Sequence, residues 1–372
     1  NGRSLTTGAA RLGWTPGPGT ELAATTRYST STSRFPTDGA GNLVDENAFL
    51  DRRQWTASVE AGRRLSAVFD ARLQAGLTSR SQVSVDRPDD EDDTQGVYAS
   101  VLDTNVERRT VEARLTAELT GVLATVGAAL DRSEGAPRYT SESEFGPFDA
   151  AADYRRANRG YYLQVLAAPL STLDLTLGGR VDDNETFGTF ETYRVGASWR
   201  LPWGSRLRGA IGTGFREPAF DQTFGSGFGD QGNPDLRPER SLSREIGLAH
   251  ELTIGPGRIR LDATWFTQRF RDLIQFTFGA DPEDPNYFNV GAARADGLEV
   301  SAEADLARFR LTAGYNFLSI NRVLRAAEQI DRSINTTQFD NGTLAGDARP
   351  ARNAVEDEFW MHGVSTGIEI KW

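Results

Sequence analysis

The sequence predicts an all-β fold, and three observations carry that prediction. Apolar and polar residues alternate strictly in many segments, the connections between these segments alternate between short and long, and no segment is a membrane helix. A membrane helix needs about 18 or more apolar residues in a row, and none of the 372 residues lies in such a run. Strands alone must therefore build the structure.

The alternation is clearest from Thr110 to Leu119. Val111 and Leu115 project to one face of this segment, whereas Glu112 and Arg114 project to the other. Successive side chains of a strand point to opposite faces, so the segment fits a strand and not an amphipathic helix. Similar apolar stripes occur in residues 65–77, 173–181, 259–265, 298–304 and 309–317.

The connections predict how the strands are joined. Short, turn-rich ones occupy residues 15–19, 63–64, 120–121, 169–172, 201–205, 254–257 and 305–306. Between them lie longer polar stretches, at residues 31–50, 86–104, 135–158, 217–240, 279–285 and 322–356, with a brief one at 184–188. Tight turns on one side and long loops on the other are typical of an up-and-down barrel in a bacterial outer membrane.

The predicted fold class is therefore a transmembrane antiparallel up-and-down β-barrel that takes up residues 1–372, with about 15–16 strands. Each strand with its connection takes about 25 residues, well above the roughly 8–12 of a soluble β-sandwich, which is the alternative fold. Within lipid every backbone group must be paired, so the sheet is expected to close.

The strand count also predicts the direction in which the first and last strands cross the membrane. If the last strand, near residues 357–372, runs inward, counting back makes the first, near residues 5–14, run inward too. Bacterial barrels have even strand numbers and ends on the inner side. We therefore expect at least one outward strand before Asn1, and predict that the chain is part of a longer protein.

Composition excludes several functions. The formal charge is −11, from 41 basic and 52 acidic residues, which opposes binding to nucleic acid. Cysteine is absent and only two histidines occur, His250 and His362, so disulfides and thiolate metal sites are excluded and histidine-based catalysis is disfavoured. The chain is not expected to be an enzyme.

One stretch carries a family resemblance. Residues 212–241 read GTGFREPAFDQTFGSGFGDQGNPDLRPERS and resemble the TonB-dependent outer-membrane receptors, most closely the branch that imports cobalamin and siderophores. The similarity extends over residues 212–317 and is weaker over 7–207. Its most specific residues are Arg216, Glu217, Pro218, Asn233, Pro234, Leu236, Pro238 and Glu239.

The resemblance implies a receptor that captures a scarce ligand with its outer loops and imports it with energy supplied by TonB. The family barrel has 22 strands, and an N-terminal plug inside it contacts TonB; no plug-like sequence is found in this chain. The alternatives are a plugless passive pore, or a receptor-derived barrel that is a structural partner in a membrane complex. The expected setting is the bacterial outer membrane, among its lipids.

Two loops carry candidate ligand sites. Phe220, Asp221, Phe224 and Phe228 lie in a glycine-rich loop, where aromatic rings either bind a ligand or, as we favour, pack the loop against itself or against a plug. A second loop holds Asp89, Asp90, Asp92 and Asp93, which either bind Ca²⁺ or form an ordinary solvated acidic segment. No other cofactor is expected.

The remaining features concern the membrane. Five aromatic residues are expected at strand ends, where aromatic rings form girdles at the lipid–water interface: Trp199, Trp203, Trp265, Tyr315 and Trp372. Arg258, Arg260, Arg308 and Arg310 should face the lumen beside Asp262, Glu299 and Glu303. At the C-terminus, Gly367, Ile370 and Trp372 resemble the signal read by the barrel-assembly machinery, the alternative being an ordinary amphipathic strand.

Overall fold

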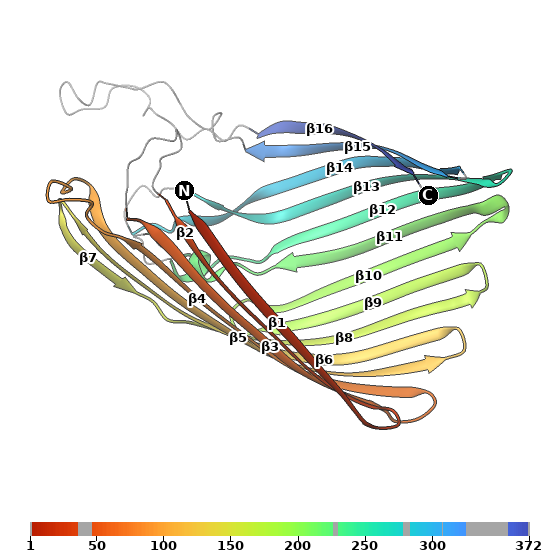
Figure 1. Cartoon of the computed structure of the whole chain (residues 1–372), viewed down its shortest axis with the longest axis horizontal. Helices are drawn as coiled ribbons and strands as arrows, with labels where there is room; N and C mark the ends of the chain where they lie inside the picture. Colours follow the sequence, from red (N-terminus) through yellow and green to blue (C-terminus); the bar gives the residue numbers. More distant parts are fainter. Residues whose placement is uncertain are drawn as a thin grey trace.

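A computed structural model of the chain describes residues 2–35, 47–225, 230–277, 283–306, 308–324 and 356–370. In this part of the chain the strands form one 16-stranded antiparallel sheet (Figure 1). No helix among these residues has the length and apolar character needed to cross a membrane. The elements are β1 (Arg3–Gly17), β2 (Thr20–Arg34), β3 (Phe49–Arg64), β4 (Phe69–Asp86), β5 (Val97–Leu119), β6 (Val122–Ser143), β7 (Gly146–Ala151), β8 (Tyr154–Leu170), β9 (Leu173–Asn184), β10 (Gly188–Arg200), η1 (Pro202–Gly204), β11 (Ser205–Arg216), α1 (Phe220–Phe224), β12 (Glu239–Ile254), β13 (Gly257–Phe276), β14 (Tyr287–Leu306), β15 (Phe309–Leu324) and β16 (Glu356–Ile370).

The sheet has the predicted up-and-down order. Each strand pairs with its neighbours in the sequence, except that β7 folds back on β6, so that β8 follows β6 in the sheet. The sheet curls, and β1 passes in front of the middle strands in Figure 1. The predicted fold class is thereby confirmed.

The two outermost strands, β1 and β16, pair on one side only within the described residues: β1 with β2, and β16 with β15. Because every pairing along the path is antiparallel and β7 lies off it, β1 and β16 run in the same direction. The expected closure of the sheet is not seen in these pairings, and the expected strand before Asn1 stays a prediction.

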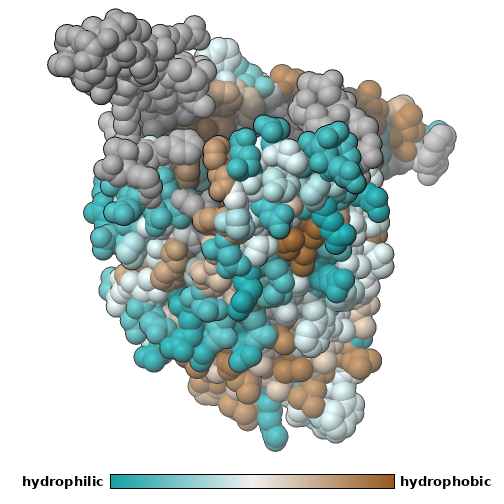
Figure 2. Space-filling view, turned by 90° about the vertical axis from the view of Figure 1, so that its left-hand side faces the viewer, coloured by the Kyte–Doolittle hydropathy of each residue, from teal (hydrophilic) through white to brown (hydrophobic). Residues whose placement is uncertain are grey.

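The two ends of the sheet differ as predicted. Tight turns such as Thr120–Gly121 join strands at one end, and the long connections lie at the other. β1 begins at the loop end, where Arg3 pairs with Ser33, and β16 finishes at the turn end. The loop end faces the viewer in Figure 2, where hydrophilic residues cover most of the surface and hydrophobic ones gather toward the lower edge.

The strands continue further outward than predicted. Residues 97–104 and 135–143, expected to be loop, extend β5 and β6, which reach 23 and 22 residues. Water meets both faces of a strand above the membrane, so alternation gives no signal there. At the turn end, residues 65–68 form a turn, whereas the sequence suggested a strand that begins at Leu65.

The apolar stripe faces outward. Val111, Leu115 and Leu261 are 44%, 37% and 42% exposed, and Leu175 is half-buried. Apolar side chains that are buried within the described residues are few: Val85, Tyr154, Phe190, Leu236 and Ala295. A β-sandwich buries its apolar faces between two sheets, so the single sheet with an exposed apolar face rules out that alternative.

Aromatic residues on this outer face lie at two levels. Trp199 and Trp203 lie at the turn end, as expected for a girdle. Trp265 and Tyr315 are exposed within β13 and β15, not at their ends as predicted. About 9–11 residues of a tilted strand cross the bilayer, and both strands continue beyond these side chains for longer than a girdle at the strand ends would require.

The inner face is polar and is braced across strands. Tyr162 of β8 covers Gly127 of β6, where an added Cβ would lie 2.3 Å from the ring, and donates a 2.6 Å hydrogen bond to Glu112 of β5. Arg208 of β11 passes Gly247 of β12 in the same way to reach Asp262 of β13. Glycine at these positions lets a long side chain lie flat against the wall and join the strands on either side.

Three of the arginines expected in the lumen form ion pairs, and of the acids expected beside them Glu303 is the one that these arginines bind in the described residues. Arg258 pairs with Glu251, and Arg260 with Glu251 and Glu303. Arg310 pairs with Glu303, Asp305 and Glu369. This part of the wall therefore pairs its arginines with acidic residues of neighbouring strands.

Candidate functional site

The connection from β11 to β12 folds inward onto the lumen wall. Its short helix α1 places Phe220 and Phe224 on the ring of Tyr154 from β8, at centroid distances of 5.3 and 5.5 Å. The Tyr154 hydroxyl donates a 2.6 Å hydrogen bond to the carbonyl of Gly225, and Thr223 is 1% exposed. Phe220 and Phe224 thus pack the loop against the wall, whereas the favoured interpretation expected them to pack it against itself or against a plug.

Arg156 of β8 is the centre of this contact. Its guanidinium carbon lies 4.7 Å from the ring centroids of both Phe187 and Phe220, so two aromatic faces enclose the charge. Nη1 donates to Glu217 Oε2 at 3.2 Å and to the Pro218 carbonyl at 2.9 Å. The Arg156 side chain is 9% exposed, which makes it a buried cation in a wall of mostly accessible ones.

A polar cavity of about 580 Å³ lies beside Arg156, on the lumen face of the wall. Glu112, Asp131, Asn158 and Arg180 line it from β5, β6, β8 and β9, and Phe220 lines it from α1. Pockets of roughly 300–1,000 Å³ hold small molecules in many proteins. The cavity is the candidate functional site, because it combines charged groups from several strands with aromatic cover from the loop.

The family motif fixes the loop in this position. Glu217 binds Arg156 and also accepts a 2.8 Å hydrogen bond from Asn184, and Arg216 pairs with Glu239 at 3.0 Å. Pro218 is fully buried. The Arg–Glu–Pro stretch is therefore a structural connection between the wall and the loop.

The second half of the motif, residues 233–239, holds the segment between α1 and β12 against the β13–β14 hairpin. Asn233 donates to the carbonyl of Tyr287 at 2.7 Å, and its Oδ1 accepts the backbone N–H of Asp235 at 2.9 Å, which forms an Asx turn. Leu236 is 3% exposed and Pro238 is buried, whereas Pro234 is exposed.

Two asparagines that sequence reasoning did not single out complete this anchor. Asn289 exchanges hydrogen bonds with the backbone N–H and carbonyl of Arg237, both 2.8 Å long. Asn286 accepts the backbone N–H of Gln231 at 2.7 Å, and Glu239 accepts that of Ile274 at 2.9 Å. Both asparagines lie in the stretch NYFN (residues 286–289). Its two closely spaced amides are the sequence feature from which this anchor could have been predicted.

The acidic loop forms hydrogen bonds within itself and with Asn47. Asp93 accepts the backbone N–H of Asp89 at 3.0 Å, Asp90 accepts that of Asp92 at 2.9 Å, and Asn47 donates to Asp89 at 2.8 Å. In the described ranges no three acidic, histidine or cysteine side chains gather as a metal site would. The Ca²⁺ interpretation stays a prediction.

Several other predicted residues are placed without a test of their role. Gly367 and Ile370 pair with Thr312 and Phe309 in the last hairpin, and Ile370 is 52% exposed. Asp221 lies in the first turn of α1. Phe228 and Trp372 lie outside the described residues. Ligand binding by the loop and recognition by the assembly machinery stay predictions.

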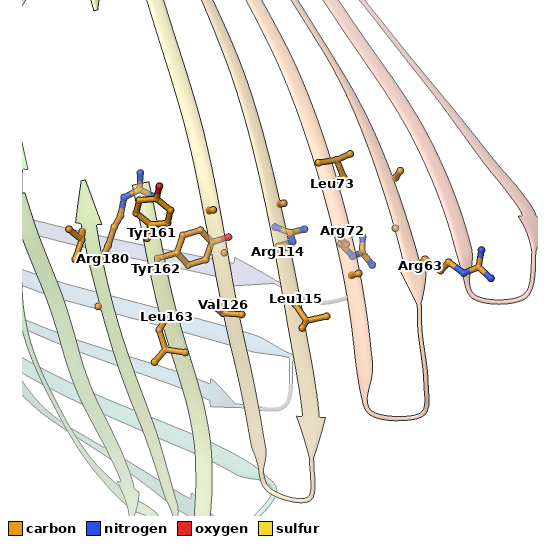
Figure 3. Close-up of a pocket in the computed structure, with 18 of the residues that line it drawn as sticks. Arg63, Arg72, Leu73, Arg114, Leu115, Val126, Tyr161, Tyr162, Leu163 and Arg180 are labelled. Carbon is orange, nitrogen blue, oxygen red and sulfur yellow. The ribbon is translucent and has the colours of Figure 1, made fainter. Parts of the chain in front are cut away.

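Figure 3 shows a second hollow, of about 1000 Å³, along β2 to β9. Leu115, Val126 and Leu163 are in register across β5, β6 and β8 and belong to the outward apolar stripe. Acyl chains cover such a surface in a barrel, so this part of the hollow belongs to the lipid-facing wall. Its lining also includes Tyr162 and Arg180, which lie on the lumen face.

The two histidines have local partners. His250 Nδ1 lies 2.8 Å from the Ser205 hydroxyl, and His362 Nδ1 lies 2.6 Å from the Tyr315 hydroxyl. Each pair joins neighbouring strands of the sheet, and neither is near the cavity residues named above.

The fold and the anchored loop can now be compared with known proteins. Residues 1–360 match the family described as TonB dependent receptor-like, beta-barrel. The chain belongs to this family. Members of this receptor family lie in the bacterial outer membrane, which is the setting of this chain, and they are receptors and transporters, not enzymes.

Solved structures agree with the fold. The siderophore receptor PirA from Pseudomonas aeruginosa superposes with a TM-score of 0.64 at 16% identity, over 86% of this chain and 58% of that one. The copper transporter OprC gives 0.65 at 16% identity, over 86% and 55%. The RagAB peptide transporter gives 0.63 at 12% identity, over 99% and 56%. The chain thus spans somewhat more than half the length of these relatives.

Proposed function

We propose that this chain forms the barrel of an outer-membrane receptor that takes up a scarce ligand, with TonB supplying the energy through a plug of the kind its family carries. Family membership supports the proposal. The single observation that carries it is the β11–β12 loop, which is anchored by the family motif and encloses a charged lumenal cavity through Arg156 and Phe220.

The ligand class follows the family resemblance and the related structures. A siderophore, cobalamin or a similar ligand is proposed for this chain. The three similar structures named above are a siderophore receptor, a copper transporter and a peptide transporter. A lumenal wall with paired charges and a polar cavity suits a hydrophilic ligand.

An uptake assay tests the proposal. Cells that lack the gene are compared with cells that carry it, each with and without functional TonB, for accumulation of labelled ferric siderophores and cobalamin. We expect accumulation of one ligand only when both the protein and TonB are present.

Two other results would point to the alternatives. Uptake that does not require TonB, together with a steady conductance in planar bilayers, would support the passive pore. A stoichiometric partner that co-purifies without any ligand uptake would support the structural role.

A further inference from the structure

The lumenal cavity contains an arginine with an open hydrogen-bonding edge. Arg156 uses only Nη1, whereas Nε and Nη2 have no hydrogen-bond partner among the described residues, although the side chain is more than nine-tenths buried. Buried polar groups almost always have partners. The open edge of Arg156 is therefore an unusual feature of this wall.

The geometry of that edge is selective. The N–H bonds at Nε and Nη2 lie in one plane and form the side-on fork with which arginine binds both oxygens of a carboxylate. The guanidinium carbon also lies 4.7 Å from the ring centroids of Phe187 and Phe220. A group that accepts both N–H bonds of the fork must lie in their plane, which favours a planar carboxylate.

A second open atom lies on the same face of β8. Asn158 donates through Nδ2 to Asp182 Oδ1 at 2.8 Å, and its Oδ1 has no partner in the described part of the chain. A carboxylate only accepts hydrogen bonds, so the amide nitrogen must face Asp182 and the oxygen is the open atom. The cavity thus offers a donor pair and a separate acceptor.

Among the described residues, two other arginines of the wall hold a carboxylate through two nitrogens. Arg180 binds both oxygens of Asp182 at 2.7 Å, and Arg208 binds both oxygens of Asp262 at 2.6 Å. Arg180 uses its Nε–Nη2 edge for this contact, and Arg208 uses its two Nη atoms. At Arg156 the neighbouring carboxylate, Glu217, contacts Nη1 and leaves the fork open.

We propose that the Arg156 fork and Asn158 Oδ1 form a subsite for a small carboxylate that also carries a hydroxyl or amino group. The carboxylate accepts from Nε and Nη2, and the hydroxyl or amine donates to Asn158. Because both nitrogens are shielded from solvent in the present arrangement, neighbouring side chains must shift as the ligand binds. The inference deepens the proposed function by naming the chemical class of its ligand.

Calorimetry on the full protein in detergent micelles tests the subsite with three probes. These are malate, a hydroxycarboxylate; succinate, which lacks the hydroxyl; and malamide, which lacks the charges. We expect malate to bind, succinate to bind several-fold more weakly, and malamide not to bind at concentrations of about 10 mM, which exceed weak millimolar affinities.

Variants locate the site. Arg156→Gln should weaken malate binding about tenfold or more, since charge-assisted hydrogen bonds are lost. Arg156→Lys keeps the charge but removes the fork, and should weaken it similarly. Asn158→Leu should remove the preference for malate over succinate. Arg208→Gln, an arginine outside the cavity, is the matched control and should bind malate like the parent protein.

Heat-dependent gel mobility shows which variants are folded, and the comparison uses those alone. The inference is overturned if malate does not bind, if folded Arg156 variants bind it unchanged, or if a structure with malate shows only water at the fork. TonB-dependent uptake of a ligand without a carboxylate would leave the proposed function standing, whereas malate binding without any uptake would retain the subsite and reject that function.

Discussion

Arg208 and Arg156 lie on the lumen face of the same sheet but are held in opposite ways. Arg208 is 37% exposed and places both terminal nitrogens on Asp262 at 2.6 Å. Arg156 is 9% exposed, is enclosed by two aromatic rings, and is bound only through Nη1. Arg208 thus forms a two-point ion pair with Asp262, whereas Arg156 is a buried cation with hydrogen-bond donors that have no partner in the described residues.

The contrast between Arg208 and Arg156 shows two roles that a charged side chain has in this barrel. Ion pairs near water contribute little to stability but keep the lumen polar and the strands in register. A buried charge is costly unless its neighbours compensate it. At Arg156 the compensation comes from Glu217, the Pro218 carbonyl and two rings, all brought there by loops. The cavity therefore depends on the loop, whereas the Arg208 pair depends only on the sheet.

The largest effect should follow from removal of Glu217. We expect Glu217→Ala to lower the free energy of unfolding by about 3–5 kcal/mol, because it leaves a buried cation without its ionic partner. Urea titration of the protein in lipid vesicles measures the loss. Glu217→Gln keeps an acceptor for Asn184 and should cost less. A loss from Glu217→Ala no larger than that from Asp262→Ala would show that the two regions do not differ.

A smaller effect should follow from Phe220→Leu. The change removes the ring that stacks on Tyr154 and covers Arg156, contacts worth about 1–2 kcal/mol together. We expect faster hydrogen exchange of the α1 amides, with little change in the strands. Phe224→Leu is the control, because Phe224 is 44% exposed and does not cover Arg156. Equal exchange rates in both variants would contradict a special role for Phe220.

Much of the sheet is predictable because lipid imposes a strict rule on it. Val111, Leu115 and Leu261 face outward as their alternation requires, and the tight turns separate the strands near the expected positions. Beyond the membrane the rule fails. Residues 135–143 read as a polar loop but extend β6, since pairing with β5 and not the side-chain pattern holds them.

The site was predictable only in part. The motif pointed to the correct loop, and Phe220 lies at the cavity. Tyr154 and Arg156 were missed because they come from a strand about 60 residues earlier, and their burial arises only when the loop folds onto the wall. The partner of Asp262 was missed for a similar reason, since Arg208 reaches it across Gly247.

The smallest loss of stability should come from a change in the Arg208–Asp262 ion pair. Asp262→Asn keeps the shape of the side chain and removes its charge, while Thr264 remains within hydrogen-bond distance of Arg208. Since both partners are about one-third exposed, water replaces part of the lost interaction, and we expect a loss of about 0.2–1 kcal/mol. Urea titrations at low and high salt measure it, and the loss should shrink at high salt because exposed charges are screened. A salt-independent loss of several kcal/mol would show that Arg208 is as poorly compensated as Arg156, and the contrast between the two regions would then be lost.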